Sequence, residues 1–199
     1  PPRPMEPTMN HSSPAPAHPP APLAVTRLLA GWHWLEKAVA MAAYVLISFM
    51  LVSDVMGREF AGPLLRLLGF DVGATGIYGS QKIALYAMIV GSFLGLGIAT
   101  ATGAHLLPRI AFGWVPASWG PKVDRLADAV TGTILCTVAW YAWVFVESSR
   151  EAGTVMATFE APVWPIQAVI PLGFLSAALR YFIFALWPAT RPRPPEFQE

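Results

Sequence analysis

The chain has 199 residues, of which 55% are hydrophobic and only 13% are charged, and its formal net charge at pH 7 is +1. A soluble domain carries about 25% charged residues, so this composition leaves too little charge for a water-exposed surface and indicates a membrane protein. The small net charge excludes a basic face for nucleic acid, and the single cysteine, Cys136, excludes a disulfide within the chain.

The N-terminal segment is rich in proline and lacks the apolar stretch of a signal peptide. Residues 1–22 hold nine of the twenty prolines, so we expect residues 1–26 to form a disordered tail. A membrane domain is expected at residues 27–188, and residues 189–199 are expected to form a second tail.

Four runs of sixteen to twenty-six residues without Asp, Glu, Lys or Arg predict the membrane spans. A spanning helix needs about 20 mostly apolar residues. With charged residues allowed at the helix ends, the spans are expected at about residues 33–56, 80–104, 125–148 and 162–187. The predicted fold is therefore an all-α membrane protein with four transmembrane helices.

The loop after the first span contains a short amphipathic stretch. The sequence "PLLRLLGF", Pro63 to Phe70, places four leucines and a phenylalanine around one arginine. This pattern predicts a short helix that lies in the membrane interface.

The second span has small residues at every fourth position. The series consists of Ala87, Gly91, Gly95, Ala99 and Gly103. Small residues at this spacing let two helix backbones approach closely. We expect a close-packing face here, with a partner helix either in the same chain or in another one.

The fourth span contains Pro171 and Gly173 and ends near Arg180. The middle of every span is free of charge, which argues against an ion or substrate site within this chain. Only Pro171 and Gly173 could expose backbone carbonyls near the midplane. We expect Arg180 to reach toward the interface and to anchor its helix end.

Tryptophan and basic residues predict how the spans lie in the membrane. Trp32, Trp34 and Trp187 fall at predicted helix ends, where tryptophan is enriched at the membrane interface. The side with both termini carries nine Lys and Arg residues, and the other side carries four. This difference predicts that both termini are cytoplasmic.

Residues for catalysis or cofactor binding are scarce in this sequence. The chain has no G-x-S-x-G motif and no P-loop, and Cys136 lies in an apolar run where a thiol is inert. We therefore expect no enzyme activity and no cofactor. One alternative is a membrane anchor of an electron-transfer complex, with a haem held by His33 and His105 at two cytoplasmic helix ends.

Three stretches, in the same order, resemble the small membrane subunit of tripartite ATP-independent periplasmic (TRAP) transporters, the DctQ type. They are "SDVMGREFAGPLL" at the end of the first span, "GAHLLPRI" at the end of the second, and "VIPLGFLSAALR" in the fourth. The last stretch is the most specific, and the resemblance covers about Leu35 to Trp187.

The resemblance implies a complex in the bacterial inner membrane. In that family a large DctM-type subunit carries the sodium and substrate sites, and a periplasmic DctP-type protein delivers a small organic acid. The small subunit braces the large one and contributes to the docking surface. Packing on the large subunit would involve the small-residue face with Pro171 and Gly173, beside membrane lipids. Docking candidates at the outer helix ends are Asp54, Arg58, Glu59, Glu147, Arg150, Glu151 and Glu160.

Overall fold

The computed structural model describes residues 21–103, 119–156 and 159–192, and these residues contain helices and no β-strand. The long helices are α1 (Leu23–Met56), α3 (Ser80–Thr102), α4 (Gly120–Glu151) and α6 (Val169–Leu186). Shorter elements are the π-helical turn η1 (Gly57–Ala61), α2 (Gly62–Leu67), α5 (Trp164–Gln167) and the 3-10 turn η4 (Pro188–Thr190). The predicted all-α class is confirmed.

Four helical segments within the described residues are long and apolar enough to cross a membrane. They are Leu23–Leu67, Ser80–Thr102, Gly120–Glu151 and Trp164–Leu186. The four predicted transmembrane helices are therefore confirmed. The first helix begins at Leu23, which lies inside the predicted tail of residues 1–26. The part of that tail before residue 21 lies outside the described residues.

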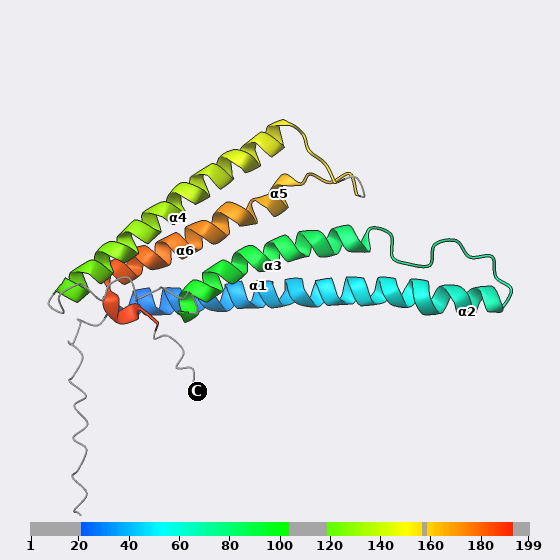
Figure 1. Cartoon of the computed structure of the whole chain (residues 1–199), viewed down its shortest axis with the longest axis horizontal. Helices are drawn as coiled ribbons and strands as arrows, with labels where there is room; N and C mark the ends of the chain where they lie inside the picture. The colour runs from blue at the N-terminus through cyan, green and yellow to red at the C-terminus, as the bar shows by residue number, and fades with distance from the viewer. Residues whose placement is uncertain (1–20, 104–118, 157–158, 193–199) are drawn as a thin grey trace, which may run out of the picture.

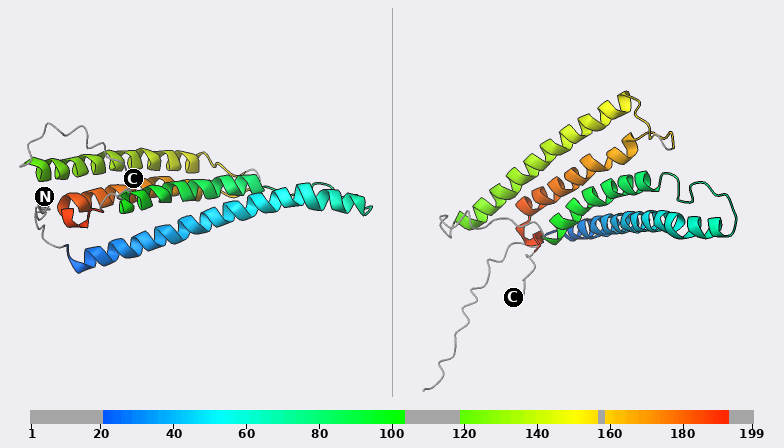
Figure 2. Two further views of the ribbon diagram at one scale, coloured as in Figure 1. Left: turned by 60° about the horizontal axis from the view of Figure 1, so that its bottom comes forward. Right: turned by 45° about the vertical axis from the view of Figure 1, so that its right-hand side comes forward.

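The helices form two antiparallel pairs in the spatial order α1, α3, α6, α4 (Figure 1). Helix α1 packs along α3, α4 packs along α6, and α3 packs against α6 to join the pairs. The two pairs lie close together at one end and separate toward the other (Figures 1 and 2). We call these the converging end, where α1 and α4 begin, and the diverging end, where α3 and α5 begin.

Burial differs strongly among the helices of this array. In the most apolar window of each span, 44% of the residues are buried for α5–α6, but only 17% for α1 and for α4. Small residues make the close contacts, and Ala177 and Ala178 of α6 are completely buried. Helix association in lipid depends on such close packing. Helix α6 is thus central, and α1 and α4 are edges with much surface that this chain leaves uncovered.

The predicted short helix after the first span exists as α2, but it continues the axis of α1 (Figure 1). Together α1, η1 and α2 form one 45-residue helical segment. At 1.5 Å per residue its length is about 67 Å, twice the roughly 30 Å of a bilayer core. Pro63 cannot donate to the carbonyl of Glu59, and the wider π-helical turn η1 directly precedes it.

The segment after α2 returns along this helix. The Thr75 hydroxyl donates a hydrogen bond of 2.6 Å to the Gly57 carbonyl. A Cβ atom on Gly57 would collide with the backbone carbonyl of Thr75, and one on Gly76 would collide with the Asp54 carboxylate. We call Gly57–Gly79 the extension. Its glycines let the returning segment lie directly against the helix.

The fourth span is interrupted at Ala168, between α5 and α6. Pro171 has no N–H to bond the carbonyl of Gln167, four residues earlier, which accounts for an interruption at this point. Pro171 and Gly173 themselves lie within regular helix and are buried.

Candidate functional site

A buried ion pair joins α1 to α6 near the converging end. Arg180 Nη2 donates to Glu36 Oε2 at 2.6 Å, and Arg180 Nη1 donates to Glu36 Oε1 at 3.1 Å. Both side chains are 3% exposed. This two-pronged geometry, with charge on both partners, makes the strongest kind of protein hydrogen bond.

Two further side chains complete the group, one turn before each charged residue. The Ser176 hydroxyl donates to Glu36 Oε1 at 2.5 Å, and Trp32 Nε1 donates to the same oxygen at 2.9 Å. Arg180 Nη1 also donates to Ser176 Oγ at 2.7 Å. We call Trp32, Glu36, Ser176 and Arg180 the ion-pair cluster. Its carboxylate is well supplied with donors, as a charge in a membrane helix requires.

Helix α3 lies between α1 and α6, and Gly97 provides the space for the cluster. A Cβ atom on Gly97 would collide with Glu36 Oε1 and would approach Arg180 Nη1 to 3.0 Å. The absence of a side chain at this position therefore lets the carboxylate of α1 reach the guanidinium of α6 across α3. Gly97 is not part of the predicted small-residue series.

The structure gives the predicted anchor residues different surroundings. Arg180 was expected to reach toward the interface, but it is 2% exposed and bound to Glu36. Trp32 is 44% exposed and donates into the cluster, while Trp34 is 71% exposed. Trp187 follows the last residue of α6 and is partly exposed. Sequence reasoning missed the role of Glu36; the available signal was a pair of opposite charges, one in the first span and one in the last, on the side of the chain termini.

The predicted small-residue face divides between contacts in the chain and open surface. Ala87 and Gly91 are buried, and a Cβ on Gly91 would approach the Tyr44 ring of α1 to 3.2 Å. Apart from its chain neighbours and the adjacent backbone of its own helix, no heavy atom lies within 4 Å of the place where a Cβ of Gly95 would stand. Ala99 is partly exposed, and Gly103 ends α3 with φ of 69°, a conformation that favours glycine.

Gly173 of α6 also packs within the chain. A Cβ there would approach the Phe93 side chain of α3 to 3.1 Å and would crowd the Phe93 backbone even more closely. The Phe93 ring meets the Phe174 ring edge-to-face, with centroids 5.7 Å apart. Gly173 thus helps to join the two helix pairs.

The predicted docking residues all lie at the diverging end, but on both helix pairs. On α1 and η1, Arg58 is paired with Asp54, whose side chain is only 8% exposed; Glu59 is exposed beside them. On α4, Arg150 bonds Glu147 at 3.2 Å and lies 5.7 Å from the centre of the Trp164 ring. Glu151 ends α4, and Glu160, with φ of 51°, lies in the loop before α5.

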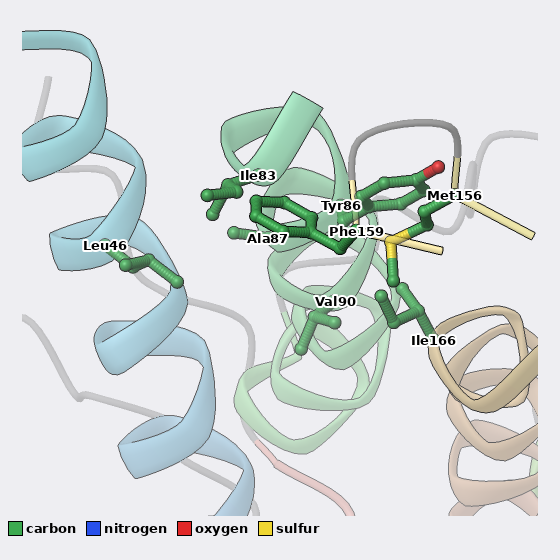
Figure 3. Close-up of a pocket in the computed structure, with 8 residues that line it drawn as sticks. All are labelled: Leu46, Ile83, Tyr86, Ala87, Val90, Met156, Phe159 and Ile166. Atoms are coloured by element: carbon green, nitrogen blue, oxygen red, sulfur yellow. The ribbon is translucent and has the colours of Figure 1, made fainter. Parts of the chain in front are cut away.

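An apolar cavity of about 280 Å³ lies at the diverging end, between the α1–α3 pair and the loop that leads into α5 (Figure 3). In Figure 3, side chains of α3 face those of the loop before α5, with α1 on one side. The cavity was not predicted from the sequence. Its lining consists of Leu46, Ile83, Tyr86, Ala87, Val90, Met156, Phe159 and Ile166.

At the converging end, Arg191 ties the segment after α6 to α4. It pairs with Asp124 at 3.2 Å and with the buried Asp128. Burial alone would lower the pKa of the Arg191 guanidinium, but the bonds and charges of these two carboxylates raise it. Residues 189–192 of the predicted C-terminal tail are thus held in place, and 193–199 lie outside the described residues.

The haem alternative receives no support from the site. His33 lies on α1, but His105 lies outside the described residues. Within the described part of the chain, no three His, Cys, Asp or Glu side chains are grouped to hold a metal ion.

Comparison with known proteins gives one match. The profile of the family described as "Tripartite ATP-independent periplasmic transporters, DctQ component" matches residues 47–190, well over half of the chain. Searches of curated proteins and of solved structures each gave no significant match. The match includes α3, α4 and α6 and the C-terminal part of α1, but not Glu36.

Proposed function

Because the chain belongs to the DctQ family and is the small membrane subunit of a TRAP transporter, we propose that it acts as a scaffold. It braces a DctM-type large subunit and helps a DctP-type binding protein to dock, in sodium-coupled uptake of a small organic acid. The proposed location is the bacterial inner membrane, with the converging end and both termini on the cytoplasmic side. The family is a family of transporter components and not of enzymes.

The open helix array carries the bracing proposal. In the spanning windows of α1 and α4, only 17% of the residues are buried by this chain. Many of their large apolar side chains are exposed, among them Phe49 at 61% and Tyr141 at 69%. Such surfaces suit contact with lipid on one face and with a second membrane protein on the other.

Gly95 and Ala99 are the best candidates for direct contact with the large subunit. They lie on the predicted small-residue face, and neither is buried in this chain. Ala87, Gly91 and Gly173 already make contacts inside the chain. Large-subunit packing is therefore proposed for the unburied part of the face, and the buried part holds the two helix pairs together.

The docking proposal follows from charge at the diverging end. Positive and negative side chains project there from both helix pairs, and Arg150 is 60% exposed in its side chain. Contacts between exposed charges are individually weak and screened by salt, which suits a soluble partner that must bind and leave in each cycle.

Co-purification with the large subunit tests the bracing role. Gly95→Leu adds a large side chain in open space, so the isolated subunit is expected to fold normally while recovery of the complex falls at least tenfold. Leu85→Ala, at an exposed position of the same helix, is the control. Full recovery of the complex with Gly95→Leu would show that this face does not contact the large subunit.

Labelling of single cysteines in Cys136→Ala protein tests the orientation. A cysteine at Gly73, exposed in the extension, is expected to react from the periplasm. A cysteine at Leu23, 74% exposed at the start of α1, is expected to react only from the cytoplasm. Reaction of both from one side would contradict the proposed four-span topology.

A further inference from the structure

The ion-pair cluster joins two helices that do not pack along each other. Helix α3 lies between α1 and α6, and the two helix pairs meet along α3 and α6. The Glu36–Arg180 bonds connect the first span directly to the last, across residues 144 positions apart in sequence. The bond from Trp32 to Ser176, at 2.9 Å, makes a second connection between the same helices.

Such a pair is a poor device for stability alone. Taking two charges out of water costs as much as their attraction returns, and well-packed apolar side chains in their place are often as stable. The pair instead specifies geometry, because its hydrogen bonds are satisfied in one relative position of α1 and α6. Gly97 adds a steric restriction, because the pair fits against α3 only where that helix has no side chain.

The location of the cluster gives it leverage over the diverging end. Glu36 lies in the first half of α1, and Arg180 lies near the end of α6. From there the two pairs separate toward the diverging end (Figures 1 and 2). A small rotation at the cluster therefore produces a larger displacement between the far ends of the pairs, where an apolar cavity lies between α3 and the loop before α5.

We propose that Glu36 and Arg180 are positioning residues that set the angle between the α1–α3 pair and the α4–α6 pair. Through that angle they set the distance between the charged groups at the diverging end, those around Arg58 and those around Arg150. This inference rests on the proposed docking function, because a soluble partner that touches both groups needs them at a fixed separation.

Spin labels on the full chain in lipid nanodiscs test the angle directly. Cysteines at Lys82 and Ala152, both exposed at the diverging end of α3 and α4, would carry the labels in Cys136→Ala protein. Wild-type pairing is expected to give one narrow distance distribution. Glu36→Gln combined with Arg180→Gln removes both charges and leaves no lone buried charge, and it is expected to broaden or shift that distribution.

Lys37→Gln is the matched control, because it removes an exposed charge beside Glu36 without touching the pair. It should leave the distribution unchanged. Arg180→Lys, which retains the charge but loses the two-pronged geometry, should broaden it as well. If the folded double variant, with wild-type helicity by circular dichroism, gave the wild-type distribution, the proposed positioning role would be overturned.

Uptake by the reconstituted transporter connects the angle to docking. The double Gln variant is expected to raise the half-saturating concentration of binding protein at least threefold, while the rate at saturating binding protein stays within twofold. A loss of the saturating rate alone, with unchanged half-saturation, would overturn the inference. If uptake with the wild-type subunit did not depend on the concentration of binding protein, the proposed docking function would fail. The distance measurement would still show whether the ion pair sets the angle between the helix pairs.

Discussion

The two ends of this helix array differ in how their charged side chains are buried and bonded. At the converging end, Glu36 and Arg180 are almost fully buried and bonded to each other. At the diverging end, charged side chains such as Arg58 and Arg150 are at least half exposed, and an apolar cavity lies between α3 and the loop before α5. Buried, directional bonds thus mark one end, and exposed charges beside an apolar cavity mark the other.

Residue size explains part of this difference. Gly97, Ala177 and Ala178 allow three helices to approach closely around the cluster. At the other end, large side chains such as Tyr86 and Phe159 line the apolar cavity (Figure 3). The array therefore has small residues at the converging end, where the polar bonds form, and large residues around the cavity at the diverging end. This difference in size accounts for an array that opens toward one side.

Replacing Gly97 with leucine should break the converging end most severely. The new side chain would occupy the place of the Glu36 carboxylate, so we expect loss of most folded protein in a detergent thermal-stability assay. Gly95→Leu, two residues earlier in open space, is the matched control and should fold. Equal loss with both variants would show that leucine is tolerated nowhere on this helix and that the cluster is not the cause.

Removing one partner of the buried pair should be the next largest effect. Glu36→Ala leaves Arg180 charged and buried, which is expected to lower the free energy of unfolding by about 3–5 kcal/mol. Glu147→Ala breaks an exposed pair with Arg150 and should cost about 0.2–1 kcal/mol. Unfolding in mixed micelles with a denaturing detergent would measure both, and similar values would contradict the contrast between the two ends.

The extension offers a smaller test. Thr75→Val removes the hydroxyl that bonds the Gly57 carbonyl, which should cost about 1 kcal/mol. Because this bond lies outside the helix packing, we expect faster hydrogen exchange in the segment before α3 and no change in α6. Thr75→Ser is the control, since it retains the hydroxyl. Faster exchange in α6 would show that the extension is coupled to the core.

Arg150→Ala should have the smallest effect on stability, below about 1 kcal/mol, because its ion pair is exposed and screened. Under the docking proposal it should raise the half-saturating concentration of binding protein in reconstituted uptake. The half-saturating sodium concentration should not change, and Arg150→Lys should retain most of the docking. A shift in sodium dependence would place this chain at the ion site.

The sequence predicted the elements better than their contacts. Long uncharged runs located the four spans, because the length of a spanning helix is set by the bilayer. The stretch "VIPLGFLSAALR" indicated the family that the comparison then matched. Arg180 was noted, but its partner was not, because Glu36 lies 144 residues away and only the packing of α3 brings them together.

Other features escaped for local reasons. Gly97 falls between positions of the four-residue series, so periodicity alone gave it no importance. The amphipathic stretch "PLLRLLGF" predicted a separate short helix in the interface, whereas the wide turn η1 lets the first helix continue to Leu67. The cavity depends on how two helix pairs diverge, which no pattern within one segment records.

The sequence separation of Glu36 and Arg180 also has a consequence for synthesis. The first span is made long before the last, so at about 5–20 residues per second Glu36 waits roughly 7–30 s for its partner to be translated. During that time its carboxylate lacks the Arg180 guanidinium that it binds in the folded chain. Closure of the pair is therefore a late event of membrane assembly, which requires all four spans to be present.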